Sequence, residues 1–372
     1  MFTARVPIAR LLVFCGLCLL LSGCATVSYY GQAVKGHWQI TRGKEDIKKL
    51  LADPDLEPEL KRRLETVIAI RSFAIDELLL PDSGSYTDYV DLERDVTLWL
   101  LSAAPAYSLS PRRWCYPFVG CFNYRGYFSR RQAEAERDRL AKNGYDVALV
   151  PGLAYSTLGF ANDPVLSTML RYSDLQLAGV LFHELAHERL YVLDDSTFNE
   201  SFATAVEKLG RQAWARQQQL GDVPISNPQA EVLRREFDQL VLEVRGELEL
   251  LYRGEDTAPA QQKAAIFDSF RRRHDTLKER WQGASPIDHW FEGEGPNNAR
   301  LALFSTYELA VPAFVALFER CERSWPCFYR AAEELADLPR SERQSRLEAL
   351  GQQAPPQWPG EAPAQPAGQP DR

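Results

Sequence analysis

The spacing of apolar residues divides the chain into regions of different structure. Between Glu45 and Leu80, apolar residues recur at every third or fourth position, which is the spacing of one face of a helix. Pro54 and Pro58 interrupt this pattern, because proline is tolerated only in the first turn of a helix. The sequence therefore predicts a short helix followed by a long one that ends before Pro81.

The pattern changes between residues 86 and 160, where short apolar runs alternate with polar and turn-forming residues. These runs predict strands, with one helix between them at 130–143. After Asp174 the helical spacing returns and continues almost to the end of the chain. The predicted strands lie at Val90, 97–100, 147–150 and 155–160, and the predicted helices span 175–191, 198–217, 227–253, 258–281, 298–320 and a last stretch to about residue 350.

Together these elements predict an α+β protein that is predominantly helical, with a small mixed sheet before a helical C-terminal half. We expect one folded domain over residues 43–350, in which N-terminal helices precede the sheet region 86–160, a helix pair at 175–217 and the C-terminal helices 227–350. The last 22 residues, 351–372, hold six of the 23 prolines among Gln, Ala and Gly, a composition that predicts disorder.

The beginning of the chain has the plan of an export signal. Arg5 and Arg10 precede an apolar run of 11 residues that ends at Leu21. A helix needs ~20 apolar residues to cross a bilayer, so this run is typical of a signal peptide and too short for a membrane span.

The Leu-Ser-Gly-Cys stretch at residues 21–24 resembles the lipobox of bacterial lipoproteins. The resemblance implies that residues 1–23 are removed as a signal peptide, that Cys24 carries the lipid, and that residues 24–42 lead from the membrane to the domain. Ala25, in place of an acidic residue, implies the outer membrane of a Gram-negative cell, facing the periplasm. An ordinary secretory signal with a chance cysteine at its end is the alternative.

Composition and charge narrow the classes of function. Of the 372 residues, 45% are hydrophobic and 25% are charged, which is ordinary for a globular protein and excludes a wholly disordered chain or one with many membrane spans. The formal net charge is −8 and no long run of Lys and Arg is present. We therefore expect no nucleic-acid partner.

The chain has seven cysteines, of which two lie in the signal peptide and one is Cys24. The other four form two local pairs, Cys115 with Cys121 and Cys321 with Cys327, each with five intervening residues. In an oxidising compartment this spacing favours two short-loop disulfides, although four cysteines allow three connectivities. A four-thiolate zinc site is the competing interpretation, but such sites favour pairs two to four residues apart.

A His-Glu-x-x-His motif carries the most specific chemistry in the sequence. His183 and His187 are four residues apart and share one face of a helix, so both imidazoles can bind a single ion. Glu184 is rotated by about 100° from His183, which places it beside a metal-bound water. Ser173 and Gln176 fit a capping box at the start of this helix.

A third ligand is expected nearby, because catalytic zinc takes three protein ligands and leaves a position for water. Glu200 opens the next predicted helix, 13 residues after His187, and the Asp-Asp-Ser stretch at 194–196 between them is turn-like. Two antiparallel helices joined by this turn would bring Glu200 to the metal.

The combination of His-Glu-x-x-His with Asn-Glu-x-x-Ala at 199–203 resembles the gluzincin metallopeptidases. The resemblance implies that His183, His187 and Glu200 bind zinc, and that Glu184 is the general base. It departs from thermolysin-like enzymes and large aminopeptidases in one respect, since only 12 residues separate His187 from Glu200. Asp194 or Asp195 is therefore the alternative third ligand.

Wider parts of the chain resemble a bacterial family of putative aminopeptidase lipoproteins. The resemblance rests on the zinc motif and on Leu-Ser-Gly-Cys with Tyr-Tyr-Gly at 29–31, Ala-Tyr-Ser-Thr-Leu-Gly-Phe at 154–160, Asn-Asn-Ala at 297–299 and Thr-Tyr at 306–307. It implies a gluzincin-like catalytic core, with the sheet before the zinc helix, and peptide substrates.

Three further features have both a functional and a plain structural interpretation. The strand expected at 155–160 lies where gluzincins hold extended peptide by its backbone, or it is an ordinary strand. Tyr307 is the candidate donor to the oxyanion, with His289 as a rival and a core or surface tyrosine as the alternative. Glu207 lies seven residues after Glu200 on the same helical face and either orients a ligand imidazole or is a solvated glutamate.

The sequence thus predicts a zinc-dependent peptide hydrolase, anchored to the membrane by lipid, in which Glu184 moves the proton and Tyr307 stabilises the oxyanion. The family resemblance implies an aminopeptidase. Large gluzincin aminopeptidases hold the substrate amine with an acid in the stretch that corresponds to 152–160, which has none here, so an endopeptidase acting on envelope proteins is the rival. A non-enzymatic envelope lipoprotein with a structural zinc is the alternative from another class, but a structural site needs no carboxylate between its ligands.

Overall fold

The computed structural model of the protein describes residues 26–116, 120–218, 228–254, 258–280, 288–293 and 295–353, and all side chains in these ranges except those at 228–235 and 288–289. The expected signal peptide, the expected lipid-bearing Cys24 and most of the proline-rich tail lie outside the described residues.

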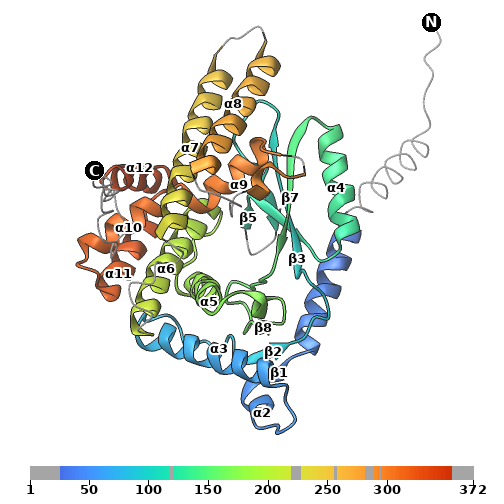
Figure 1. Cartoon of the computed structure of the whole chain (residues 1–372), viewed down its shortest axis with the longest axis vertical. Coiled ribbons are helices and arrows are strands. Elements are labelled where there is room, and N and C mark those ends of the chain that lie inside the picture. The colour runs from blue at the N-terminus through green and yellow to red at the C-terminus, as the bar shows by residue number, and fades with distance from the viewer. Residues whose placement is uncertain are drawn as a thin grey trace, which may run out of the picture.

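The fold is α+β and predominantly helical, as the sequence predicts (Figure 1). A first helix covers residues 26–42. The other helices are α2 (Ile47–Leu51), α3 (Pro58–Asp76), α4 (Arg130–Lys142), η1 (Met169–Arg171), α5 (Asp174–Arg189), α6 (Ser196–Gln217), α7 (Pro228–Arg253), α8 (Pro259–Arg280), η2 (Asp288–Phe291), α9 (Asn298–Glu308), α10 (Val311–Arg320), α11 (Trp325–Ala336) and α12 (Arg340–Gly351). The strands are β1 (Glu45–Asp46), β2 (Asp88–Val90), β3 (Leu98–Pro105), β4 (Trp114–Tyr116), β5 (Gly120–Phe122), β6 (Tyr124–Tyr127), β7 (Tyr145–Gly152) and β8 (Val165–Leu166).

The strands form three small sheets where the sequence predicts one. β3 lies between β6 and β7 and pairs antiparallel with both, and α4 packs on this sheet through Ala133 and Leu140. β2 pairs antiparallel with β1 and parallel with β8, so this second sheet is mixed. β4 and β5 form a separate hairpin, in which Cys115 lies opposite Cys121 and is joined to it by a disulfide.

The prediction of a strand at 155–160 is wrong, because these residues are irregular and form a turn at Leu158 and Gly159. The carboxylate of Asp163 accepts hydrogen bonds from the backbone N–H of Thr157 at 2.7 Å and from the hydroxyls of Thr157 and Ser156. Leu158 and Gly159 have positive φ angles of 55° and 81°, which no strand adopts. The side chain of Asp163, which lies outside residues 155–160, therefore holds these residues in a turn.

The single helix expected at 298–320 is divided into α9 and α10. Pro312 lies in the first turn of α10, where it has no N–H to bond the carbonyl of Glu308 and its ring would clash with that carbonyl in a continuous helix. Among the described residues, Asn298–Arg320 is the one stretch whose length and mean hydropathy of 1.7 would suit a membrane span, but 61% of its apolar window is buried inside the protein. Its composition is that of a core element.

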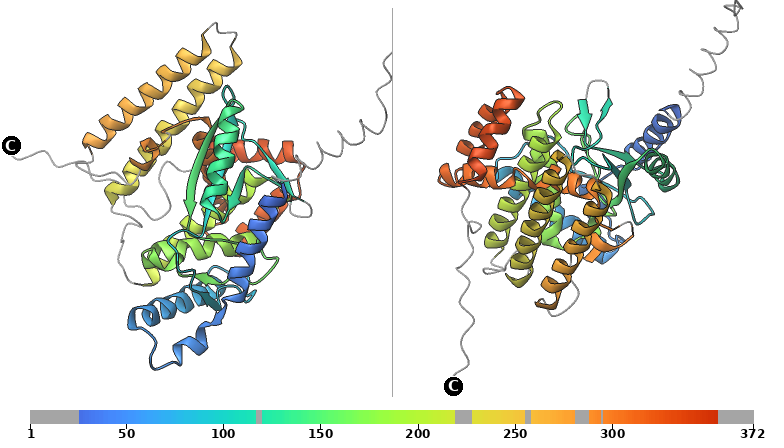
Figure 2. Two further views of the ribbon diagram at one scale, coloured as in Figure 1. Left: turned by 90° about the vertical axis from the view of Figure 1, so that its right-hand side faces the viewer. Right: turned by 90° about the horizontal axis from the view of Figure 1, so that it is seen from above.

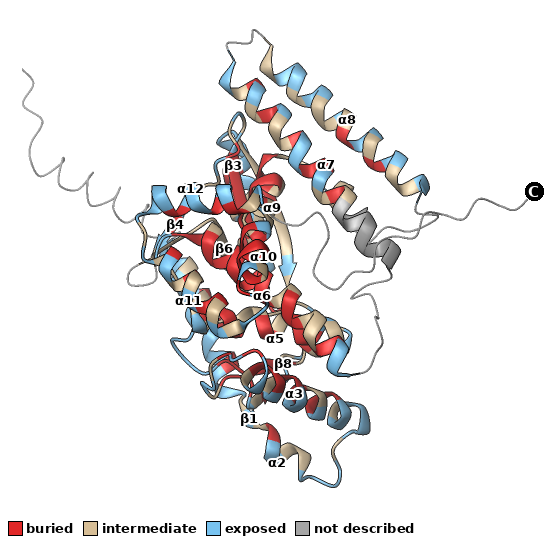
Figure 3. Cartoon of the chain, turned by 90° about the vertical axis from the view of Figure 1, so that its left-hand side faces the viewer, coloured by how far each residue is buried: buried red, intermediate tan, exposed pale blue. Residues whose placement is uncertain are grey.

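The main core is built around α6, which lies in the middle of the helical half (Figure 3). Fourteen of its residues are buried, and the ring of Phe202 packs against aromatic rings from α10 and α11. The Cys321–Cys327 disulfide joins the end of α10 to α11 beside this cluster. The two cysteine pairs that the spacing favours are therefore the two that the structure joins.

A second, smaller core lies under the hairpin of α7 and α8, which extends from one end of the molecule (Figure 2). Phe237 of α7 stacks on Phe270 of α8, and Leu301 of α9 belongs to the same cluster. The metal motif lies in the main core, on the pair α5 and α6.

The turn between α5 and α6 is fixed by side chains at its own ends. Asn199 accepts a hydrogen bond from the backbone N–H of Val192 and donates one to its carbonyl, at 2.7 and 2.8 Å. Asp195 caps α6 by accepting from the N–H of Phe198. The other oxygen of Asp195 pairs with Arg343 of α12 at 2.9 Å, and both side chains are nearly buried.

The buried pair of Asp195 and Arg343 gives a test of what holds this turn. Asp195→Ala leaves the Arg343 charge without its partner and α6 without its cap, so we expect the free energy of unfolding to fall by about 3–5 kcal/mol. Urea denaturation followed by circular dichroism, with the disulfides intact, measures it. The neighbouring Asp194→Asn is the control, because the Asp194 side chain is 49% exposed and should change stability by less than about 1 kcal/mol. Equal midpoints for Asp195→Ala and the parent would contradict the prediction.

Candidate metal centre

Three side chains from α5 and α6 converge on one point. Glu200 Oε2 lies 3.2 Å from His183 Nε2 and 3.5 Å from His187 Nε2. The three ligand atoms lie within 4.8 Å of one another. The structure thus brings together the three residues that the motif and the resemblance single out.

The helix spacing explains why these atoms meet. His183 and His187 are one turn apart on α5, whose start is fixed by the reciprocal capping box of Ser173 and Gln176. Glu200 is in the second turn of α6, directly after the Asn199 that clamps the turn to α5. The short connection therefore suffices to place Glu200 against both histidines.

The alternative third ligands lie elsewhere. Asp195 caps α6 and pairs with Arg343, as described above. Asp194 Oδ1 accepts a hydrogen bond from the backbone N–H of Cys121 at 2.7 Å and faces Arg113 at 3.6 Å. Both aspartates hold the turn and the β4–β5 hairpin in place, and neither joins the metal group.

The donor set fits a zinc ion. Two imidazole nitrogens and a carboxylate oxygen are ligands that catalytic zinc sites use. Tetrahedral ligands at ~2.1 Å from zinc are roughly 3.4 Å from each other, and the two nitrogen-to-oxygen separations are 3.2 and 3.5 Å. These two separations therefore match the spacing around such an ion, and the two imidazole nitrogens lie within 4.8 Å of each other.

The carboxylate of Glu200 and the imidazole of His183 shift each other's pKa values, and His187 also acts on the pKa of Glu200. Burial alone would raise the pKa of Glu200, but the charge of His187 and the hydrogen bonds of both histidines outweigh burial and lower it. For His183, burial alone would lower the pKa. Its hydrogen bonds to Glu200 and Glu207 outweigh burial, so the pKa of His183 is raised. A buried negative charge is thus stabilised by the imidazoles that face it.

Outer side chains orient two of the three ligands. Glu207 Oε2 lies 3.3 Å from His183 Nδ1 and also pairs with Arg211, which leaves Nε2 of His183 for the metal. Tyr124 of β6 donates a hydrogen bond to Glu200 Oε1 at 2.8 Å, which leaves Oε2. Such partners fix the orientation of ligands, so the interpretation of Glu207 as a solvated glutamate does not hold. Nδ1 of His187 is buried and has no hydrogen-bond partner among the described residues.

Glu184 lies beside the metal group with no hydrogen bond or ion pair to any described residue. Its charge contributes to raising the pKa values of Tyr307, Tyr86 and Asp163, after burial as the main cause in each case. Glu184 is therefore close to all three groups and free to act on a ligand.

Tyr307 of α9 adjoins the centre. Its ring stacks on the ring of His183 at 6.2 Å and on that of Tyr124 at 6.3 Å. Burial, with the charge of Glu200, raises the pKa of Tyr307 well above its ordinary value, so the phenol keeps its proton. The rival residue, His289, has its backbone in η2 and its side chain outside the described part of the structure.

A further set of groups near Glu184 is not predicted from the sequence. The hydroxyl of Ser85 donates to Glu188 Oε1 at 2.7 Å and accepts from the N–H of Asp163 at 2.9 Å. Tyr86, Asp163 and Glu188 come from separate segments, and the phenol of Tyr86 is acted on by both carboxylates. The one signal in the sequence was Glu188, which follows the motif by one residue and lies one turn after Glu184.

Three carboxylates near Tyr86 therefore lack cationic partners among the described residues. Glu184, Asp163 and Glu188 form no ion pair with any described residue. Burial raises the pKa of Asp163 to about 6, and Glu188 Oε2 is buried without a hydrogen-bond partner. The region has an excess of negative charge.

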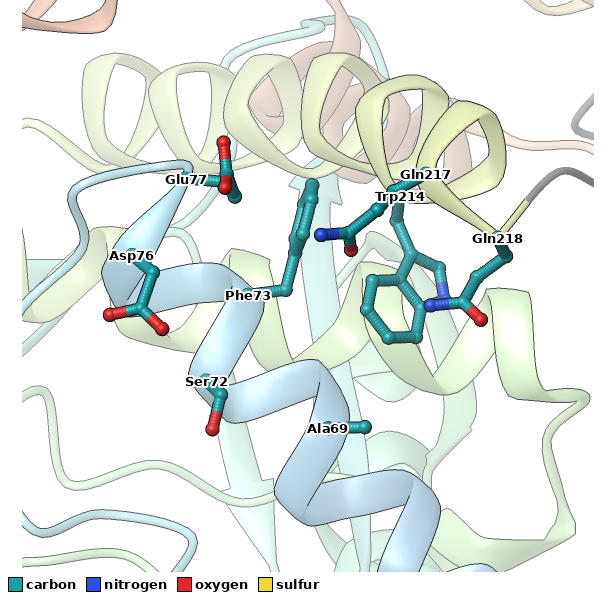
Figure 4. A pocket seen from close by; sticks show the side chains of 8 residues that line it. All are labelled: Ala69, Ser72, Phe73, Asp76, Glu77, Trp214, Gln217 and Gln218. Atoms are coloured by element: carbon teal, nitrogen blue, oxygen red, sulfur yellow. The ribbon is translucent and has the colours of Figure 1, made fainter.

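One cavity of about 270 Å³ lies away from this chemistry, between α3 and the end of α6 (Figure 4). Phe73 and Trp214 are among the residues that line it, and none of the candidate site residues is.

A family model described as putative aminopeptidase matches residues 28–347, which include the whole metal group and Tyr307. No curated protein and no solved structure matches the chain.

The geometry predicts one bound divalent metal ion per chain. His183→Ala or Glu200→Ala removes a ligand, so we expect the metal content of the purified protein to fall close to zero, as measured by elemental analysis after dialysis. Glu207→Gln is the matched control, because it keeps an acceptor for Nδ1 and should retain the metal with affinity lowered by at most roughly 10- to 100-fold. Full metal content in His183→Ala and Glu200→Ala would place the ion elsewhere.

Proposed function

The chain belongs to the putative aminopeptidase family, and from this premise we propose that it is a zinc-dependent peptidase of the gluzincin type that removes residues from the N-terminus of peptides. The observation that carries the proposal is the convergence of His183, His187 and Glu200, with Glu184 beside them and without a partner. A site with only a structural role has no use for that fourth group.

Different residues carry out metal binding, proton transfer and oxyanion stabilisation in the proposed hydrolysis. His183, His187 and Glu200 would hold zinc, which when bound polarises the peptide carbonyl and makes water a stronger nucleophile near neutral pH. Glu184 takes the proton from the attacking water and passes it to the leaving amine. Tyr307, protonated because its pKa is raised, donates a hydrogen bond to the oxygen that becomes negative.

The negative charge of Glu184, Asp163 and Glu188 favours a substrate with a free N-terminus. The stretch 152–160 has no acid to hold an amine, but Gly159 within it lies against Glu188. Glu188, with Glu184 and Asp163, creates a potential that attracts the positive α-ammonium group of a peptide. This charge excess supports an aminopeptidase over an endopeptidase.

We also propose that the protein is lipid-anchored at Cys24 in the outer membrane and faces the periplasm, after removal of residues 1–23. The lipobox-like stretch at 21–24 supports the anchor, and the two disulfides suit an oxidising compartment. In this proposal the metallopeptidase domain covers residues 43–350, and peptides are its partners.

The proton-transfer role gives the most direct test of the chemistry. Glu184→Gln keeps the size and the three metal ligands but removes the basic carboxylate, so we expect kcat for peptide hydrolysis to fall ~10²–10⁴-fold at unchanged metal content. Glu65→Gln, on the exposed face of α3, is the control and should keep the parent rate. Equal rates in Glu184→Gln and the parent would show that the activity belongs to another site. A zinc-loaded parent that cleaves nothing in a broad peptide library would favour a non-enzymatic lipoprotein.

The preference for a free N-terminus is tested with matched peptides. We expect kcat/KM to be roughly 10- to 100-fold higher for free than for N-acetylated peptides, since a charge-assisted contact contributes about 1.5–3 kcal/mol. Glu188→Gln should raise KM for the free peptides and leave the acetylated ones unchanged. Internal cleavage of acetylated peptides at the same rate would identify an endopeptidase instead.

A further inference from the structure

The helix at residues 26–42 has two apolar faces, and among the described residues only one of them packs against the rest of the protein. It lies on the outside of the molecule and runs from near one end of α4 toward β1, as the first coloured helix in Figures 1 and 2. One face packs on the domain and the other is exposed.

The inner face is held by specific contacts. Gln32 accepts a hydrogen bond from the backbone N–H of Phe128 at 2.7 Å, and Gly36 lies so close to the ring of Phe128 that a Cβ atom would clash. Ile40 is 2% exposed. The ring of Tyr29 packs on Tyr127, with the Arg125 guanidinium over it. The rotation of the helix about its axis is therefore fixed.

The outer face presents large apolar side chains to solvent. Val27 is 71% exposed, Tyr30 42%, Val34 67% and Trp38 55%. At about 100° per residue these four positions fall within an arc of about 80°, opposite the inner face. The described residues include 12 exposed large hydrophobic side chains, and four of these 12 lie in this one short helix. An exposed patch of this kind marks a surface that is covered by something else.

The charged residues of the helix indicate which kind of partner the outer face contacts. Residues 26–44 contain no Asp or Glu, although the whole chain has 51 of them, and they carry Lys35, Arg42 and Lys44. The guanidinium of Arg42 lies over the ring of Trp38 at 5.0 Å. Trp and Tyr with flanking basic residues are typical of helices that lie at the interface of a membrane with anionic lipids.

The position of the helix in the chain points to the same partner. Its first described residue, Thr26, is two residues after Cys24. Two residues span at most about 7 Å, so acyl chains on Cys24 would hold the start of the helix against the headgroups of the bilayer.

We propose that the face formed by Val27, Tyr30, Val34 and Trp38, which we call the outer face, docks into the headgroup region of the membrane that carries the lipid anchor. The proposal rests on the proposed lipidation of Cys24 and is independent of the peptidase chemistry. The helix then lies flat on the membrane. Its apolar contact with the headgroup region is a second attachment, in addition to the lipid on Cys24.

Site-directed spin labelling of the full chain, produced with its signal and purified from membranes, tests the proposal. Cys24 is blocked by lipid and the other four cysteines of the mature chain are in disulfides, so one introduced cysteine is labelled alone. Val34→Cys reports the outer face, and Gln39→Cys, exposed on a different side of the same helix, is the matched control. The protein is reconstituted into vesicles of phosphatidylethanolamine and phosphatidylglycerol.

We expect the label at Val34 to be several-fold more accessible to oxygen than to a water-soluble nickel complex, and the label at Gln39 to show the reverse. A second variant, Val27→Cys with Val34→Glu and Trp38→Glu, should stay on the membrane through its lipid while its label becomes accessible to water. Its kcat/KM for a soluble peptide should equal that of the parent, because the outer face is outside the metal centre.

Each opposing outcome has a distinct meaning. Lipid-bearing protein with equally water-accessible labels at Val34 and Gln39 would overturn the docking and leave the anchor standing. Dipolar broadening between labels at Val34 would identify a second copy of the chain as the occupant and overturn it as well. A mass spectrum without lipid on Cys24 would overturn both the anchor and the docking, while the peptidase assays would be unaffected.

Discussion

The buried charge of Glu200 is the constraint on which the rest of the structure depends. A carboxylate in a protein interior costs several kcal/mol unless it is paired and hydrogen-bonded. His183 and His187 face it from α5, and Tyr124 donates to it from β6. Because these partners come from separate elements, α5 and the sheet that contains β6 must both pack against α6 at Glu200. The small sheet and the helical half thus meet at one carboxylate.

The sequence predicts the parts of this arrangement that local spacing encodes. Any helix places His183 and His187 on one face, and a short turn brings Glu200 back to them. Tyr124 and Arg343 reach the same region from far away in the chain, and no local pattern marks either of them. The helices around the motif are also encoded by local spacing, and their positions are predicted well.

The strand expected at 155–160 fails for a related reason. Its aromatic and apolar residues favour a strand locally, but the carboxylate of Asp163 binds the backbone N–H of Thr157 and makes a turn the better conformation. That turn also contacts the first helix, because Tyr155 hydrogen-bonds His37 at 3.1 Å and packs on Phe128. The helix that we place on the membrane is therefore joined directly to the segment beside the motif helix.

The pairing of Arg343 with Asp195 has a consequence for the order in which the molecule is made. Every candidate metal ligand has been synthesised by residue 200, yet the turn that aligns these residues is completed by a side chain from the last helix. During vectorial synthesis or passage across a membrane, the earlier segments emerge first and begin to fold first. The pair that holds the turn can form only when the chain is almost complete, so a nascent or truncated molecule carries His183, His187 and Glu200 without the contact that fixes the turn between them.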